Sequence, residues 1–260
     1  MTKAKLIAGF YRSTSPKHWL RLSWYLFAWS AWHTLGVKLS GEQTLIFRPF
    51  RVVVDPRGRG GLFFLHEILV RNIYALDQLP GAGVVFDVGA NCGFFALMQT
   101  AKHPKLNVYC FEPHPETFQR LQKNIAVNKL TRVVAIHTAV GAMSGSCQIN
   151  VSAESSMAIV NSSSVQFLIA PKTVEVPLTS LDDFAAARNV WPHFLKIDVE
   201  GFEAEVLRGA QRCLERSHAV VLEYHSAELQ IECIGLLSAA GFTTRLMDER
   251  LLAGTKITAQ

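Results

Sequence analysis

The stretch Val84-Val85-Phe86-Asp87-Val88-Gly89-Ala90-Asn91-Cys92-Gly93 decides the fold of this chain. Mostly apolar side chains predict a buried strand over residues 84–88, and the two glycines that follow predict a tight turn. Residues 93–102 then continue with helix-forming side chains. Open α/β sheets bind their ligands at such places, where the carboxyl end of a strand meets a turn.

Strands and helices alternate along the rest of the chain, which predicts a mostly parallel sheet covered by helices on both faces. The main strands are expected at 107–112, 132–137, 193–198 and 219–223, and the main helices at 115–128, 202–214 and 227–240. Residues 241–246 start a further strand that residues 255–258 could join as a terminal antiparallel hairpin. Shorter elements are expected as strands at 44–48, 50–54, 147–151 and 173–176, helices at 63–74 and 181–188, and a Ser-rich loop at 152–164.

The N-terminal part differs in charge and composition from the rest. Residues 1–79 hold 11 Lys and Arg against 4 Asp and Glu, while the whole chain has a formal net charge of +5. Residues 17–38 are rich in Trp and Leu and end in a lysine, which fits a helix packed on the main domain or at a dimer contact. The same pattern fits a peripheral membrane helix, and a transmembrane span is the least favoured interpretation.

The five cysteines form no C-x-x-C pair, which indicates reduced, packed thiols in a cytoplasmic protein, with membrane association through residues 17–38 as the open question. Neither a structural zinc site nor a nucleic-acid partner is expected. A homo-oligomer is compatible with the sequence. We expect an N-terminal helical extension over residues 1–45 and a Rossmann-like domain over residues 46–260.

The turn favours a particular class of ligand. Dinucleotide sites use G-x-G-x-x-G, whereas here Gly89 and Gly93 are separated by three residues and Asp87 precedes them. A carboxylate repels phosphate but suits an amine, such as that of S-adenosylmethionine. Glu112 ends the second strand, where a carboxylate can accept both hydroxyls of a ribose. The alternatives are a turn or N-cap role for Asp87 and a surface position for Glu112.

The chain resembles the FkbM-type S-adenosylmethionine-dependent methyltransferases over residues 62–247. The resemblance rests on ordered motifs with plausible spacing, which are Phe86–Gly93, Phe111–Pro115, Ala139–Gly141, Leu181–Asp183, Leu195–Glu203 and Glu223–His225. It implies a class I methyltransferase fold, that is, an α/β three-layer sandwich with a seven-stranded, mostly parallel sheet. It also implies methylation of a hydroxyl on a sugar or natural-product type of small molecule.

The resemblance further implies which residues bind the cofactor. The methionine part would be held by Asp87, Gly89, Ala90, Asn91 and Gly93. Glu112 would bind the ribose, and the adenine would lie near Pro113, His114, Ala139 and Val140. Glu67 and Tyr74 fall where family members place residues beside the cofactor.

Asp198, Glu200 and His225 are the candidate catalytic residues, because each follows a predicted strand at the same edge of the sheet. Asp198 could contact the cofactor, deprotonate the acceptor or help to hold a divalent metal such as Mg²⁺, although no complete ligand set is evident. A capping role is the alternative. Glu203 lies in a first helical turn, where an acid favours the helix dipole. A histidine of near-neutral pKa at position 225 is a candidate general base.

The favoured function is therefore a methyltransferase that uses S-adenosylmethionine to methylate a small-molecule hydroxyl. Two other classes stay open. One is a non-catalytic, membrane-associated or scaffold protein that keeps the fold. The other is a nucleotide-dependent oxidoreductase, which Asp87 disfavours because it stands where a phosphate would bind.

Overall fold

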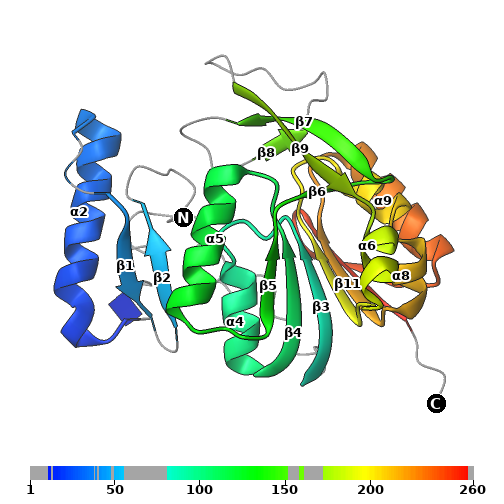
Figure 1. The fold of residues 1–260 in the computed structure, drawn as a ribbon, viewed down its shortest axis with the longest axis horizontal. Coiled ribbons are helices and arrows are strands. Elements are labelled where there is room, and N and C mark those ends of the chain that lie inside the picture. Colours follow the sequence, from blue (N-terminus) through cyan, green and yellow to red (C-terminus); the bar gives the residue numbers. More distant parts are fainter. Residues whose placement is uncertain are drawn as a thin grey trace.

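The computed structural model describes residues 11–12, 14–37, 39, 41–47, 50–55, 81–151, 158–160 and 172–256. Its centre is a seven-stranded sheet with the order β12-β13-β11-β10-β3-β4-β5 (Figure 1). The strands are β3 (Ala82–Val88), β4 (Lys105–Phe111), β5 (Val133–Ile136), β10 (Phe194–Ile197), β11 (Ala219–Glu223), β12 (Thr243–Asp248) and β13 (Leu251–Thr255). Neighbouring strands from β11 to β5 run parallel, and β13 is antiparallel to both of its neighbours. The predicted class I fold is confirmed.

Two apolar cores lie on the two faces of this sheet, because successive strand residues point to opposite sides. Val85 belongs to one core, with helices α4 (Phe94–Lys102) and α5 (Pro115–Val127). Phe86 and Val88 belong to the other, where Phe86, Phe111 and Phe184 meet edge to face. The helices on that second side are α6 (Leu181–Arg188), α7 (Glu203–Arg208), α8 (Gln211–Arg216) and α9 (Ala227–Ala239) (Figure 1).

Two predicted elements differ in their bounds. The single helix expected over 202–214 is broken into α7 and α8 at Gly209. A Cβ at Gly209 would lie 2.0 Å from the carbonyl oxygen of Gly141, so this close approach of two backbones explains the glycine. The terminal hairpin uses residues 251–255 as its second strand, so its pairing starts earlier than predicted and reaches Thr255, while residues 257–258 lie outside the described residues.

A second sheet follows β5 and was predicted only in fragments. It has the order β6-β9-β7-β8 and so lies beyond the carboxyl end of β5. Its strands are β6 (Ala139–Val140), β7 (Gly145–Val151), β8 (Ala158–Val160) and β9 (Lys172–Thr179). The strands expected at 147–151 and 173–176 are parts of β7 and β9. Most of the loop expected at 152–164, like the helix expected at 63–74, lies outside the described residues.

The described part of the N-terminal region includes the short helix η1 (Pro16–His18), helix α2 (Trp19–Leu35) and an antiparallel hairpin of β1 (Gln43–Ile46) and β2 (Arg51–Val54). Leu22 and Tyr25 of α2 are buried in the first core. The hairpin is fastened to α5, since Asn124 Oδ1 accepts the Val53 N–H at 2.6 Å. Among the described residues, no helix has the length and apolarity needed to cross a membrane. The domain division at residue 45 stays a prediction.

Candidate active site

The glycine turn after β3 is clamped between the neighbouring strands. Gly89 has a left-handed backbone (φ +72°), and a Cβ there would lie 1.7 Å from the carbonyl oxygen of Asp198. The N–H groups of Gly89 and Ala90 both donate to the carbonyl oxygen of Phe111, each at 3.0 Å. Only glycine fits at position 89, because a side chain would separate β3 from the end of β10.

The second half of the turn leads into α4. Asn91 (φ 51°) and Gly93 (φ 81°) are both left-handed, and the Asn91 side chain stabilises its own turn by accepting the Cys92 N–H at 2.7 Å. A Cβ at Gly93 would lie 2.5 Å from Leu121 of α5. The turn is therefore a compact structure that places backbone groups at the carboxyl end of β3.

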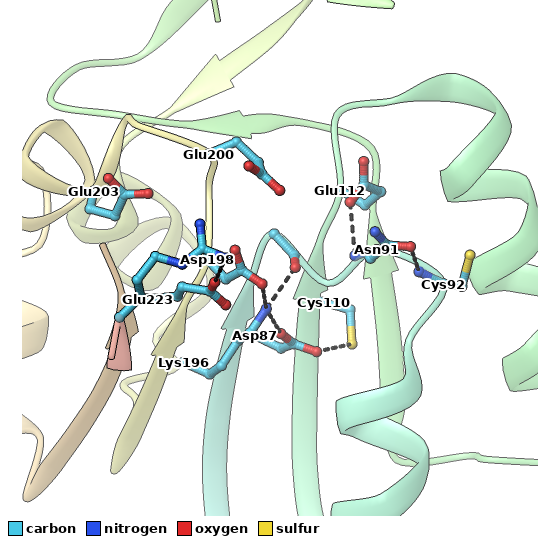
Figure 2. A network of polar contacts seen from close by, with 12 residues as sticks. Asp87, Asn91, Cys92, Cys110, Glu112, Lys196, Asp198, Glu200, Glu203 and Glu223 are labelled. Atoms are coloured by element: carbon cyan, nitrogen blue, oxygen red, sulfur yellow. Dashed lines mark hydrogen bonds and ion pairs between the residues drawn. The ribbon is translucent and has the colours of Figure 1, made fainter. Parts of the chain in front are cut away.

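Glu112 follows β4 and reaches across to this turn (Figure 2). Its Oε2 accepts the Asn91 N–H at 2.8 Å, and its Oε1 accepts the His114 N–H at 2.8 Å. The carboxyl group is buried, which raises its pKa to about 7, although the two backbone hydrogen bonds oppose the shift. Glu112 is thus held in one orientation beside the turn.

Of the residues expected around the adenine, Pro113 and His114 directly follow Glu112 in sequence, and all but Pro113 are buried. His114 caps α5, since its Nδ1 accepts the Thr117 N–H at 3.4 Å. Its Nε2 is buried and has no hydrogen-bond partner among the described residues. Ala139 and Val140 are buried in β6, while Pro113 is half-buried. The predicted positions Glu67 and Tyr74 lie outside the described residues.

Asp87 has a partner within the protein. The register of β3 and β10 places it opposite Lys196, whose Nζ lies 3.4 Å from Asp87 Oδ1 and 3.5 Å from Asp198 Oδ2. The same ammonium donates to the carbonyl oxygen of Gly89 at 2.7 Å (Figure 2). Burial raises the pKa of Asp87, and Lys196 opposes that shift. An amine of a bound ligand would have to share this fully buried carboxylate with Lys196.

The predicted catalytic residues Asp198, Glu200 and His225 are brought together by β10 and β11. His225 Nε2 lies 3.2 Å from Glu200 Oε2, and His225 Nδ1 lies 2.8 Å from Glu203 Oε1. Burial alone would lower the pKa of His225, but the hydrogen bonds to the two glutamates outweigh it and raise the pKa to about 10. The expectation of a near-neutral histidine is wrong, because two carboxylates hold its proton.

Sequence reasoning missed three residues that shape the site. Lys196 was seen only as part of a motif, yet a lysine inside a fully buried strand needs a charged partner. Glu203 was assigned to the helix dipole, whereas it is buried against His225. Glu223 ends β11, and burial followed by repulsion from Asp198 raises its pKa to about 7. The lysine signal was visible in the sequence, and the other two contacts depend on tertiary structure.

The chain is similar to known methyltransferases. The profile of the methyltransferase FkbM domain matches residues 87–250. The hexuronic acid methyltransferase AglP of Haloferax volcanii is 31% identical over 175 residues, which cover 66% of this chain and 68% of that protein. The 31-O-demethyl-FK506 methyltransferase FkbM of Streptomyces tacrolimicus is 29% identical over 226 residues, covering 75% and 86%. The 2-O-methyltransferase NoeI of Sinorhizobium fredii is 24% identical over 172 residues, covering 61% and 70%.

Proposed function

The chain belongs to the FkbM methyltransferase family, and from this premise we propose that it methylates a hydroxyl of a sugar or natural-product type of small molecule. S-adenosylmethionine supplies the methyl group, bound to a positively charged sulfur. The observation that carries the proposal is the arrangement of two polar groups around one glycine turn. Glu112 lies on one side of the turn, and the carboxylates of Asp198 and Glu200 lie on the other (Figure 2).

The residues on the Glu112 side fit the cofactor. A ribose would offer two hydroxyl donors to the Glu112 carboxylate, which already has its orientation fixed by two backbone N–H groups. The buried Nε2 of His114 lacks a partner among the described residues, and an adenine edge would give it one. Asp87 would act through Lys196, which anchors the carbonyl of Gly89 and so keeps the turn in shape.

The residues on the other side suit the acceptor. During transfer the acceptor oxygen forms a bond to the methyl carbon, the carbon–sulfur bond breaks, and the hydroxyl proton must leave. Asp198 and Glu200 are the half-buried carboxylates placed to receive that proton, and His225 holds Glu200 in position. The rest of the rate enhancement would come from alignment of the acceptor oxygen, the methyl carbon and the sulfur, and from exclusion of water.

Transfer of a labelled methyl group to a panel of hexuronic acids, neutral sugars and macrolide alcohols tests this proposal. A methyl ether on a hydroxyl survives mild alkali, whereas a methyl ester on a carboxyl group is hydrolysed. We expect alkali-stable label that Glu200→Gln reduces and that Glu205→Gln, an exposed carboxylate on α7, leaves unchanged. Alkali-labile label would show a carboxyl acceptor and overturn the hydroxyl assignment.

We further infer that the exposed face of α2 rests on an anionic membrane surface. Leu20, Trp24 and Phe27 are 87%, 48% and 59% exposed and follow one another at helical spacing. The helix contains no acidic residue, and Lys17 and Arg21 beside this face are exposed. Exposed aromatic residues next to basic ones are typical of helices that lie in the membrane interface.

Sedimentation with vesicles that contain anionic lipid tests the membrane contact. The double variant Leu20→Ser/Phe27→Ser is expected to stay in the supernatant, while Ile231→Ser, a control at a 74% exposed position on α9, is expected to sediment like the unchanged protein. Equal sedimentation of all three proteins would remove the membrane interpretation. A change of oligomeric state in the double variant alone would assign the face to a second copy of the chain.

A further inference from the structure

We propose that Asp198, Glu200 and His225 form a site for a divalent first-row transition-metal ion. The proposal rests on the proposed function and deepens it, because these residues form the acceptor side of the site. One ligand atom from each residue, two carboxylate oxygens and an imidazole nitrogen, lies within 4.8 Å of the other two. All three side chains are 17–23% exposed, so an ion could reach them from solvent.

Glu203 is not one of the three ligands, but its contact with His225 supports this interpretation. It is fully buried, and its Oε1 accepts hydrogen bonds from His225 Nδ1 and from the Gly201 N–H, both at 2.8 Å. This contact fixes the imidazole so that Nε2 faces Glu200. Metal-binding histidines are commonly oriented in this way, with a carboxylate on the ring nitrogen that does not bind the ion. The other oxygen of Glu203 has no hydrogen-bond partner among the described residues.

The charge around His225 also calls for a cation. The carboxylates of Glu200 and Glu203 lie 3.2 Å and 2.8 Å from the two imidazole nitrogens, and an oxygen of Asp198 lies within 4.8 Å of the other two ligand atoms. Lys196 is an opposing charge beside Asp198, but it is shared with Asp87. An ion at this place would replace the proton between His225 Nε2 and Glu200.

The loop between β10 and α7 contains two consecutive residues with a left-handed backbone. Glu200 adopts φ 53°, and Gly201 adopts φ 104°. A left-handed conformation is unfavourable for a residue with a side chain, and such strain is kept mainly at functional sites. Here it turns the carboxylate of Glu200 toward His225.

The donor set indicates which ion binds. Mg²⁺ prefers oxygen ligands alone, whereas a mixed set of carboxylates and imidazole suits Mn²⁺, Fe²⁺ or Zn²⁺. The ion would hold the acceptor oxygen and lower the pKa of its hydroxyl, so that with an ion bound the proton leaves to water at neutral pH and Asp198 and Glu200 serve as ligands in place of accepting the proton directly. The oxygen then forms its bond to the methyl carbon as the carbon–sulfur bond breaks. His225 completes a ligand set that was not evident from the carboxylates alone.

Titration of the full-length, chelator-treated protein with Mn²⁺ alone tests the site, with the paramagnetic resonance signal of free Mn²⁺ as the readout. We expect one bound ion per chain. His225→Gln should abolish binding, and Glu203→Gln should weaken it about 10- to 100-fold because the imidazole loses its orientation. Glu232→Gln, an exposed carboxylate on α9, is the matched control and should leave binding unchanged.

Glu200→Gln keeps size and shape at a partly exposed position, so it tests the site even where the His225 variant fails to fold. Binding of S-adenosylmethionine is measured on the same samples without Mn²⁺. Normal cofactor binding with no Mn²⁺ binding, or with Mn²⁺ binding that Glu200→Gln leaves intact, would overturn the metal site and leave the proposed function standing. Mn²⁺ binding that depends on Glu200, in a protein that binds no cofactor, would support the metal site and contradict the proposed function.

Discussion

Replacement of Lys196 by Met is expected to destabilise the protein by about 3–5 kcal/mol. Lys196 is 3% exposed, and its ammonium nitrogen lies 3.4 Å from Asp87 and 3.5 Å from Asp198. At an effective dielectric constant of about 20, each of these distances corresponds to an attraction of about 5 kcal/mol. Desolvation of the ammonium offsets part of this attraction. Breaking the pair leaves the fully buried Asp87 uncompensated, which is the larger penalty.

The stability lost in the Lys196→Met variant should depend on pH, and the protonation of Asp87 determines whether the loss grows or shrinks as pH rises. Burial already raises the pKa of this carboxyl group, and without Lys196 it would rise further. A carboxyl whose folded pKa is raised contributes stability at low pH that disappears as pH rises through that pKa. The variant should therefore differ less from the unchanged protein at pH 5 than at pH 8.

Urea denaturation followed by circular dichroism measures these differences. Asp87→Asn in the Lys196→Met background should restore part of the lost stability, because the uncompensated charge is then gone. Arg208→Met is the control, since Arg208 is 42% exposed and pairs with exposed Glu205 and Glu232, and its loss should cost about 0–1 kcal/mol. A loss for Lys196→Met as small as that of the control would refute the reasoning.

Three further predictions concern the turn and Glu112. Gly89→Ala should cost about 4 kcal/mol or more in a thermal melt, because its Cβ would meet the Asp198 carbonyl. Gly36→Ala, with a similar left-handed φ (+68°) but open space around the added Cβ, should cost about 1–2 kcal/mol, and equal losses would contradict this. Glu112→Gln should weaken S-adenosylmethionine binding about 10- to 100-fold in calorimetry, since a charged acceptor is lost; unchanged affinity would remove Glu112 from the site. In the unchanged protein the affinity for S-adenosylmethionine should be about tenfold weaker at pH 6 than at pH 8, because Glu112 has a pKa of about 7 and accepts both ribose hydroxyls only when it is ionised. The affinity of the Glu112→Gln variant should depend less on pH.

The main sheet could be predicted from the sequence because its strands are buried on both faces. Phe194, Leu195 and Ile197 form an apolar run of strand length, and the glycines after residue 88 end the first strand clearly. The second sheet was harder to predict, because β7 and β9 each have only one fully buried residue and pair across a gap of twenty residues. Local patterns show such strands without showing that they pair.

The candidate site, like the fold, was predictable from the sequence only in part. Asp198 and Glu200 were predictable because acids after a buried strand lie at the ligand-binding edge. The pairing of Lys196 with Asp87 depends on the register of two strands far apart in the sequence. The protonation of His225 depends on two carboxylates that only the folded chain brings to its two nitrogens. Position along the chain indicated which residues face the site, and tertiary contacts set their charge.

Calorimetric titration with S-adenosylmethionine tests the central claim most directly, with NAD and the Glu112→Ala variant as comparisons. The account predicts one site with an affinity on the order of micromolar, about −8 kcal/mol, that Glu112→Ala abolishes and at which NAD gives no heat. Heat with NAD and none with S-adenosylmethionine would contradict it.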